Sequence, residues 1–592
     1  MDVSNVNKLL VKRAPSKTLV VRFNLFCFAI FLIVYATLLL RLPSSVYFDS
    51  AASLVGCSLR ECHHKAEKGI QIKGVLEELP KPKSWKPKAN GTKIEVPNFL
   101  GEKIGKEMKI GMVNMNEDDD ISEWNIHGEI IPINFDKVSQ FFNWKDLFPE
   151  WIDEEEESEV PTCPELPMPE FATYENMDII VAKLPCKYPE EGWAREVLRL
   201  QVHLMVANMV VKKGKKDWKR KSRVIFWSKC RPMLEIFRCD DLVNHEGDWW
   251  FFEVDVKRLE QKVSLPVGSC NLALPIWEQG IDKMEQNVRS KTRAKHEAYA
   301  TILHSSERYV CGAITLAQSL LKTGTKRDLI LLIDSSISVR KRHALKGAGW
   351  KIRTITRIGN PRGKNGTYNK YNYTKIRLWQ LSDYEKIIFI DSDILVLRNL
   401  DILFNFPQMS ATGNARSIFN AGMMVIEPSD CTFSVLMNLR HDIVSYNGGD
   451  QGFLNEIFVW WHRLPNRVNY LKNFWANTTV EASVKNGLFS ADPPKLYAIH
   501  YLGLKPWHCY RDYDCNWDVV DQRVYASDVA HQRWWNFHDR MDKNLQSFCR
   551  LTRQRRTELN WERRRSSNMG SLDYQWKVKV IDPRNSDSHL MD

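Results

Sequence analysis

The C-terminal half of the chain alternates short apolar runs with amphipathic segments. The apolar runs predict strands at residues 298–303, 328–333 and 350–355, and the amphipathic segments predict helices at residues 312–321 and 339–347. This succession is typical of a doubly wound, mostly parallel α/β sheet. Because such sheets bind ligands beyond the carboxyl ends of their strands, residues at those ends are the first candidates for chemistry.

Two aspartates interrupt the apolar run at residues 386–397. The run is broken by Asp391, Ser392 and Asp393, which places two carboxylates at the carboxyl end of a predicted inner strand. Mg²⁺ and Mn²⁺ prefer oxygen ligands and commonly lie between carboxylates and the phosphates of a substrate. Asp and Ser are also ordinary turn formers, so a simple turn is the alternative. The pattern makes these residues a candidate clamp for a metal and a diphosphate.

Residues 23–40 carry no charge and are long enough to cross a bilayer. Basic residues precede this segment, at Lys8, Lys12, Arg13, Lys17 and Arg22. Their excess predicts a single-pass type II membrane protein, with residues 1–22 cytosolic and the rest lumenal. A cleaved signal peptide is the alternative. Glycosylation sequons at Asn90, Asn365, Asn372 and Asn477 are consistent with a lumenal body.

The composition changes along the predicted lumenal part. Residues 41–160 are rich in Lys, Pro, Gly and acidic runs, which predicts a stem. Residues 161–290 contain denser apolar segments and are expected to form a small accessory module, in which His203 is interpreted as a packed core residue. The α/β pattern predicts a catalytic domain at residues 291–530, which leaves residues 531–592 as a C-terminal extension.

The overall composition indicates a folded protein with several domains. The 592 residues are 44% hydrophobic and 26% charged, and acidic runs interrupt the net charge of +12, so no nucleic-acid partner is indicated. Arginines cluster near the end of the chain, at positions 550, 553, 555, 556 and 563–565. We expect a solvated helix face or tail there, with an acidic polysaccharide as an alternative contact.

The cysteines fit an oxidising compartment. All but Cys27 of the 13 cysteines follow the predicted anchor, where a lumen would let some of them pair. Three pairs are close in sequence, namely Cys57 with Cys62, Cys230 with Cys239, and Cys509 with Cys515. The spacing of the cysteines does not determine which of them pair. A structural zinc site is not indicated, because the repeated Cys-x-x-Cys arrangement is missing from the sequence.

Three further motifs follow the aspartates in a fixed order. They begin with Phe419-Asn-Ala-Gly, Asn447-Gly-Gly-Asp-Gln-Gly and His500-Tyr-Leu-Gly-Leu-Lys-Pro-Trp. Together with the aspartates, residues 296–520 resemble glycosyltransferase family 8, the family of glycogenin and many plant Golgi transferases. The resemblance implies a GT-A-type fold. The anchor, long N-terminal part and cysteine-bearing tail are most similar to the plant glycogenin-like branch, whose members add glucuronic acid to xylan.

The resemblance implies a metal site and a diphosphate site. The matching residues of the family place Asp391, Asp393 and His500 on Mn²⁺, and a neutral imidazole beside carboxylates suits Mn²⁺ better than an ion that prefers only oxygen. Lys505 is a compact charge suited to the diphosphate, and Gly503 would let the backbone approach it. The metal-binding aspartates and the intervening Ser392 are also expected to contact the donor.

The same resemblance assigns residues to the donor sugar. Asn420, Ala421 and Gly422 would hold sugar hydroxyls, although the residues alone also fit a strand-entry turn. The Gly-Asp-Gln-Gly sequence looks like a turn leading into a helix, with Asp450 as its N-cap. Its counterpart in the family faces the sugar near the reacting carbon. We therefore expect Asp450 and Gln451 to position the sugar.

A nucleoside site and a third catalytic residue complete the expected set. By the resemblance, Leu303, Ser305, Ser306 and Tyr309 would contact the uridine, with Tyr309 stacked on uracil. A helix cap and a packed tyrosine would explain this loop equally well. Lys375 matches a lysine near the donor phosphate and sugar, and an amphipathic helix that exposes it to solvent is the alternative. Lys375 is thus expected to act with Asp450 and Gln451 in catalysis.

The expected activity is a Mn²⁺-dependent, retaining transfer of glucuronic acid from UDP-glucuronate to xylan in the Golgi lumen. The glucuronate carboxylate calls for a cation, with Arg377, Arg416 and Lys364 as candidates. The alternatives are another donor (UDP-galacturonate, UDP-galactose or UDP-glucose) and a noncatalytic scaffold of a wall-polymer synthase complex. Partners are the Golgi membrane and, as a further candidate, other wall-polymer synthases. Glycogenin-type members have an acid where this chain has Asn447, and self-glucosylation is not implied.

Overall fold

The computed structural model describes residues 107–115, 128–148, 164–187, 195–265, 296–568 and 578–580, together with positions 97, 99, 104, 105, 124 and 582. Within these ranges no helix combines the length and the apolar character needed to span a bilayer. The predicted anchor at residues 23–40 lies outside the described residues.

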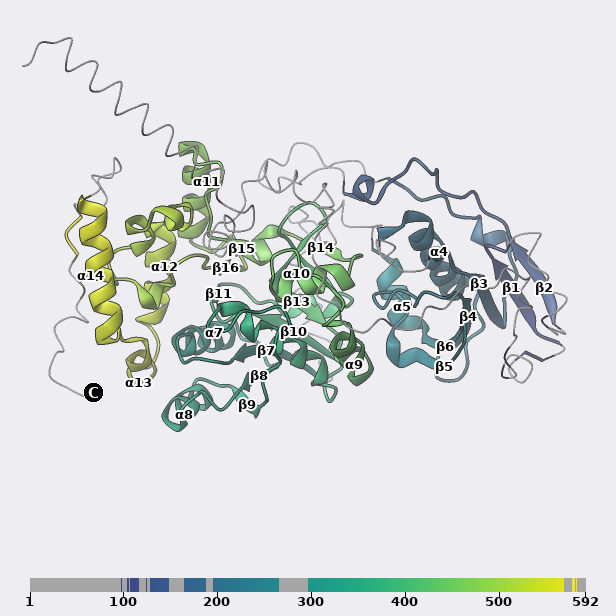
Figure 1. The fold of residues 1–592 in the computed structure, drawn as a ribbon, viewed down its shortest axis with the longest axis horizontal. Helices are drawn as coiled ribbons and strands as arrows, with labels where there is room; N and C mark the ends of the chain where they lie inside the picture. Colours follow the sequence, from purple (N-terminus) through teal and green to yellow (C-terminus); the bar gives the residue numbers. More distant parts are fainter. Residues whose placement is uncertain are drawn as a thin grey trace, which may run out of the picture. The chain divides into compact units, whose positions relative to one another are not determined.

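A seven-stranded mixed sheet forms the centre of the C-terminal half (Figure 1). Its strands are, in order across the sheet, β14 (His462–Leu464), β12 (Ser410–Gly413), β13 (Phe419–Ile426), β10 (Lys386–Ile390), β7 (Glu297–Leu303), β8 (Asp328–Ile333) and β9 (Lys351–Thr354). Strands β10, β7, β8 and β9 are mutually parallel, β13 is antiparallel to both neighbours, and β14 is parallel to β12. The predicted α/β fold is confirmed, and its sheet is mixed with a majority of parallel pairs.

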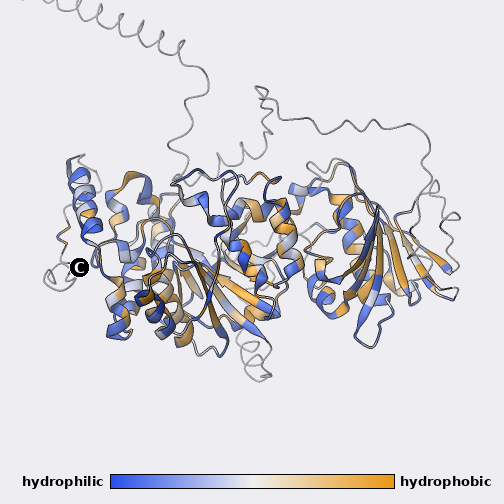
Figure 2. Ribbon diagram, turned by 60° about the horizontal axis from the view of Figure 1, so that its bottom comes forward, coloured by the Kyte–Doolittle hydropathy of each residue, from blue (hydrophilic) through white to orange (hydrophobic). Residues whose placement is uncertain are grey.

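The predicted strands and helices of this half are confirmed. Helix α7 (Val310–Lys322) follows β7 in the chain, and helix α8 (Val339–Gly347) follows β8. The predicted strand at residues 350–355 is β9. Every residue of β10 is buried, which explains its continuous apolar run, and the strands of both large sheets are mostly hydrophobic in Figure 2. The segment after β9 that carries Lys375 forms a 3₁₀ helix, η7 (Asn372–Gln380).

A small sheet of three strands lies beside the carboxyl end of β10. Strand β11 (Ile394–Val396) pairs antiparallel with β16 (Ala498–His500), which pairs in parallel with β15 (Tyr470–Leu471). The apolar run at residues 386–397 is therefore two strands in two sheets. The aspartate segment is the crossing between them, and this crossing sets the position of the site.

The accessory module contains a six-stranded sheet. Its strands are, in order, β2 (Glu129–Ile133), β1 (Lys109–Val113), β3 (Ile179–Lys183), β4 (Lys221–Trp227), β6 (Trp249–Asp255) and β5 (Leu242–Glu246). The boundary between stem and module at residue 160 is wrong, because β1 pairs with β3 and β2 pairs with β1. Both strands have only five residues and are flanked by charged segments, so their apolar signal is weak.

Helices lie beside the two large sheets (Figure 1). The helices not yet given are α4 (Val197–Lys213), α5 (Val256–Val263), α9 (Asp430–Leu439), α10 (Asp450–Ile457), α11 (Thr479–Ser490), α12 (Asp528–His538), α13 (Lys543–Gln546) and α14 (Arg553–Asn568). The predicted boundary at residue 530 cuts α12, whose buried Trp534 packs in one cluster with Ile499 and Trp507. The last segment thus belongs to the catalytic half.

Disulfides and buried ion pairs join distant parts of the chain. Among the described residues, the bonded pairs are Cys186–Cys230, Cys239–Cys431, Cys311–Cys549 and Cys509–Cys515. Cys239–Cys431 links the accessory module to α9, and Arg238 pairs with the buried Glu427 at 3.2 Å beside it. Of the neighbours in sequence, Cys509 and Cys515 pair with each other, whereas Cys230 and Cys239 pair elsewhere.

The late arginines do not form one solvated face. Arg555 is buried and binds Glu562 through two hydrogen bonds of 3.0 and 3.1 Å. Arg563 lies 3.6 Å from Asp518, while Arg564 on the same helix is exposed. The expectation of a solvated helix is therefore right for only part of α14.

His203 is a core residue, as expected, and both of its ring nitrogens have hydrogen-bond partners. Its Nδ1 lies 2.7 Å from the carbonyl oxygen of Arg199, and its Nε2 accepts a hydrogen bond of 3.0 Å from the backbone N–H of Met233. The neutral ring is thus satisfied at both nitrogens, and a second proton would face a donor. Burial, aided by the Arg199 charge, lowers the pKa of His203 to about 3.

We expect this histidine to destabilise the fold as the pH falls below about 6.5, because only the unfolded chain then takes up its proton. The free energy of unfolding should drop by about 1.4 kcal/mol per pH unit until the folded pKa is reached. Denaturation curves followed by tryptophan fluorescence at pH 7 and pH 5 should show about 2 kcal/mol more loss for the wild type than for His203→Gln. If the wild type and His203→Gln lost the same free energy of unfolding, the proton would be taken up by a residue other than His203.

Candidate active site

The aspartate segment is fixed at both ends by backbone hydrogen bonds. The N–H of Asp391 donates to the carbonyl oxygen of Gly422 on β13 at 2.8 Å, and the carbonyl oxygen of Asp393 accepts from the N–H of Tyr501 at 3.0 Å. Ser392 between them is buried, and its carbonyl oxygen lies against Gly312 of α7. The two carboxylates are therefore presented from a rigid crossing between sheets.

The structure brings Asp391, Asp393 and His500 together, as the sequence predicts. One ligand atom from each lies within 4.8 Å of the others. His500 ends β16 and pairs in register with Ile394, the residue after Asp393. Gly422 makes room for the ring, since a Cβ there would lie 2.5 Å from His500 Cε1. The position of the histidine ring thus requires a residue without a side chain at Gly422.

These three side chains fit a divalent cation. Asp393 Oδ1 is a buried side-chain atom without a hydrogen-bond partner among the described residues, and His500 Nε2 lies 3.4 Å from it. Buried polar atoms are normally satisfied, so this carboxylate oxygen beside an imidazole nitrogen indicates a ligand. Two carboxylates and one imidazole suit Mn²⁺ and related transition metals better than an ion restricted to oxygen.

Two lysines flank the carboxylates. Lys505 Nζ lies 2.7 Å from Asp393 Oδ2 and also donates to the carbonyl oxygen of Tyr501 at 2.6 Å. Lys375 Nζ lies 2.5 Å from Asp450 Oδ2 and 3.5 Å from Asp391 Oδ1. Lys375 is buried on η7, so the alternative of a solvent-facing lysine is excluded.

The charges of the site shift its proton equilibria in opposite directions. Desolvation raises the pKa of Asp391 to about 6, opposed by Lys375 and aided by the neighbouring Asp393. Desolvation acts on Asp393 too, but Lys505 and His500 together outweigh it and hold the pKa of Asp393 well below its usual range. The site therefore keeps one strongly acidic carboxyl and one that releases its proton only near neutral pH.

Asp450 pairs with Lys375 and does not cap its helix. Helix α10 begins at Asp450 with Gly449 as its N-cap, so the predicted N-cap is wrong by one residue. The side chain of Asn447 accepts hydrogen bonds from the N–H groups of Gly449 and Gly452, at 2.9 and 3.1 Å. Asn447 therefore satisfies the helix start and leaves the Asp450 carboxylate for Lys375. Its short polar side chain before a glycine pair is the signal that could have indicated this role.

Gln451 is held between the strand β13 and a tyrosine. Its Oε1 accepts from the N–H of Ala421 at 3.1 Å, and its Nε2 donates to the hydroxyl of Tyr446 at 2.8 Å. The carbonyl oxygen of Ala421 accepts from Lys375 Nζ at 3.2 Å. The predicted sugar-positioning residues Ala421, Asp450 and Gln451 thus form one hydrogen-bonded group.

Asn420 belongs to an amide network that the sequence did not indicate. Its Oδ1 accepts from the N–H of Gly422 at 2.9 Å and from Asn469 Nδ2 at 3.1 Å. Its Nδ2 donates to Asn414 Oδ1 at 3.2 Å. Asn414 and Asn469 come from loops with no motif of their own, and only the fold brings them to the site.

The predicted uridine residues lie in the loop between β7 and α7. Leu303 ends β7 and is buried, and Ser305 has a left-handed backbone with φ of 67°. The N–H of Ser305 donates to Asp334 Oδ2 at 3.2 Å, and Ser306 follows on the same turn. Asp334 follows β8 directly, so the rule that selected Asp391 could also have found it.

Tyr309 lies between this loop and the Lys505 loop. Its ring meets Trp507 edge-on, with the centroids 5.9 Å apart. Burial raises the pKa of Tyr309, and Lys505 and Asp393 are close enough to influence it. The structure therefore brings Tyr309 close to Lys505 and Asp393.

The cations proposed for a sugar carboxylate differ in their surroundings. Arg377 donates to the hydroxyl of Thr356 at 2.7 Å and to Gln380 Oε1 at 2.6 Å. Arg416 is exposed on the loop between β12 and β13, two residues from Asn414. Arg416 is therefore the better placed of these two arginines to meet a ligand.

The chain is similar to several known proteins. Residues 87–270 match the family described as GUX1-5 N-terminal domain, and residues 300–414 match glycosyl transferase family 8. The chain is 60% identical to the Arabidopsis thaliana protein UDP-glucuronate:xylan alpha-glucuronosyltransferase 2, over 98% of this chain and 99% of that protein. It is 46% identical to UDP-glucuronate:xylan alpha-glucuronosyltransferase 1 of the same plant, over 83% of this chain and 72% of that protein. A solved structure of the galactosyltransferase LgtC, with donor and acceptor sugar analogs, matches 42% of this chain and 99% of that one at 17% identity, with a TM-score of 0.29.

Proposed function

The chain belongs to the UDP-glucuronate:xylan alpha-glucuronosyltransferase family within glycosyltransferase family 8, and we propose that it transfers glucuronic acid from UDP-glucuronate to the xylan backbone. The observation that carries the proposal is the group of Asp391, Asp393 and His500 beside Lys505 and the Lys375–Asp450 pair. An anionic diphosphate needs this combination of metal ligands and fixed ammonium groups. The reaction would serve the synthesis of glucuronoxylan for the plant cell wall.

The residues divide between the leaving group and the sugar. A bound Mn²⁺ would supply Lewis-acid stabilisation of the departing UDP, and Asp391, Asp393 and His500 would hold it. Lys505 stabilises the charge that develops on the diphosphate, because a preorganised ammonium needs no rearrangement as the bond breaks. Gln451, held by Ala421 and Tyr446, orients the sugar.

Donor and acceptor are tested together by incubating the full-length protein with Mn²⁺ and xylo-oligosaccharides. We expect mass spectrometry to show addition of one glucuronic acid residue from UDP-glucuronate, and little product from UDP-galacturonate, UDP-galactose or UDP-glucose. Product from one of those donors alone would replace the assigned sugar. No UDP release from any donor by a folded protein would leave the scaffold function instead.

The location of the enzyme is part of the proposal. The uncharged segment at residues 23–40 and the basic residues before it support a single-pass type II protein of the Golgi membrane with a lumenal catalytic domain. The disulfides in the described residues support an oxidising compartment. Protease digestion of intact Golgi vesicles should leave the catalytic domain protected; its degradation would contradict this orientation. Other wall-polymer synthases are proposed partners.

A further inference from the structure

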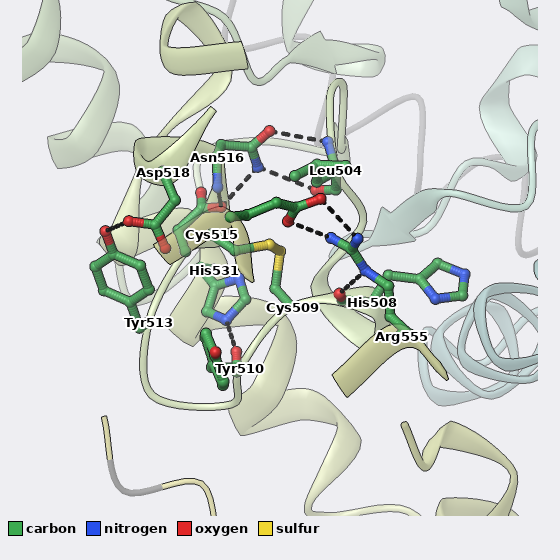
Figure 3. Close-up of a disulfide and its surroundings, with 12 residues drawn as sticks. Leu504, His508, Cys509, Tyr510, Tyr513, Cys515, Asn516, Asp518, His531 and Arg555 are labelled. Atoms are coloured by element: carbon green, nitrogen blue, oxygen red, sulfur yellow. Dashed lines mark hydrogen bonds and ion pairs between the residues drawn. A yellow bond between two sulfur atoms is a disulfide. The ribbon is translucent and has the colours of Figure 1, made fainter. Parts of the chain in front are cut away.

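The loop that carries Lys505 is held by a side chain outside the family motifs. Asn516 lies on the 3₁₀ helix η11 (Cys515–Asp518) and faces the backbone of Leu504, as Figure 3 shows. Its Oδ1 accepts from the N–H of Leu504 at 2.8 Å, and its Nδ2 donates to the carbonyl oxygen of Leu504 at 3.0 Å. One amide side chain thus binds both backbone groups of the residue before Lys505.

The amide of Asn516 is itself fixed by buried charges. Its Nδ2 also donates to Asp514 Oδ1 at 2.6 Å, and Asp514 Oδ2 accepts from Lys472 Nζ at 2.5 Å. The backbone N–H of Lys472 donates to the carbonyl oxygen of His500 at 2.9 Å. Asn516, Asp514 and Lys472 are completely buried. A continuous chain of contacts therefore joins the metal-ligand strand to the Lys505 loop.

The loop is shaped to receive this amide. Gly503 has a φ of 74°, and a Cβ there would lie 2.4 Å from Asn516 Oδ1 and 2.8 Å from Tyr525. From the sequence, Gly503 was expected to let the backbone approach the diphosphate. In the structure, the missing side chain at Gly503 makes room for the amide of Asn516. The Cys509–Cys515 disulfide closes the segment between the two partners and anchors the start of η11.

We propose that Asn516 is a positioning residue of the transfer reaction, whose amide fixes the Leu504 backbone and thereby sets the reach of Lys505 toward the diphosphate of the UDP-sugar. The inference rests on the proposed function. Lys505 has a flexible side chain, so its precision depends on where its backbone is held. A displacement of about 1 Å at such a group can lower a rate on the order of 100-fold.

The test compares Asn516→Ala with the wild type in the full-length protein. We expect the Kd of UDP, measured calorimetrically with Mn²⁺ present, to rise by about tenfold, and kcat/KM for UDP-glucuronate to fall by roughly 10- to 100-fold. The KM for xylo-oligosaccharide should stay within about twofold of the wild-type value, because Asn516 acts on Lys505 and therefore on the binding of the donor. A residue that only supports folding would not separate donor from acceptor in this way.

Asp518→Asn is the matched control, because Asp518 is buried on the same 3₁₀ helix but binds Tyr513 and Arg563. It should lower Tm while leaving the Kd of UDP within about twofold of the wild type. Asn516→Ser removes the reach to Leu504 with a smaller loss of packing and serves if the alanine variant does not fold. Values for the Asn516 variants equal to those of Asp518→Asn would overturn the proposal. If the Asn516 variants raise the Kd of UDP but the wild-type protein transfers no sugar, the result would support the role of Asn516 in positioning Lys505 and overturn the proposed function.

Discussion

Asp393→Asn is expected to abolish transfer, with a loss of about 1000-fold or more in kcat, because it removes a charged metal ligand from the centre of the site. The asparagine keeps the shape of the side chain but leaves Asp391 and His500 as the only ionisable ligands of the group. The Lys505 ammonium also loses its partner at 2.7 Å. Transfer should be measured as UDP release at saturating Mn²⁺.

Thermal unfolding without added metal should also shift to lower temperature in this variant, because the lowered pKa of Asp393 means that Lys505 and His500 stabilise its charged form in the folded protein. Asp401→Asn is the control, because Asp401 is a carboxylate that accepts from Tyr299 and Thr325 near the amino end of β8. It should lower stability and keep activity. Wild-type activity in Asp393→Asn would exclude this residue from the metal site.

Lys375→Met should damage both activity and stability. The substitution removes the ammonium between Asp391 and Asp450 and leaves two carboxylates without a counter-charge. We expect a loss on the order of 100-fold in kcat/KM, since one fixed charge of the site disappears. The free energy of unfolding should fall by roughly 3 kcal/mol, at the low end for broken buried pairs because Asp391 is 33% exposed.

Lys386→Met separates the two effects. Lys386 is a buried lysine at the amino end of β10, where its Nζ donates to the carbonyl oxygen of Phe406 at 2.5 Å. Its removal should cost comparable stability, measured by chemical denaturation, without loss of transfer. If both variants lost activity in proportion to stability, Lys375 would have no catalytic role.

The strands β7 and β8 and the helix α7 were predictable because most of their residues are buried. The apolar run at residues 386–397 was also visible, but its division between two sheets was not. Strand β11 pairs with β16, which lies about 100 residues later in the chain, and local hydrophobicity carries no information about such a partner.

The candidate site shows the same limit. Asp391, Asp393 and His500 were identified because they end apolar strands and belong to recognisable motifs. Asn414, Asn469 and Asn516 were not, since an isolated polar residue in a loop has many explanations and only the folded contacts select one. Short polar side chains that bind backbone groups are therefore the part of the site that depends most on tertiary structure.

The Cys311–Cys549 bridge has a consequence for how the protein is made. Cys311 lies in α7, next to the predicted uridine loop, and its partner follows it by 238 residues. A chain that enters a lumen during translation cannot close this covalent link until nearly all of the described residues have been synthesised. In the proposed lumenal location, this link beside the predicted uridine loop therefore closes late and requires an oxidant.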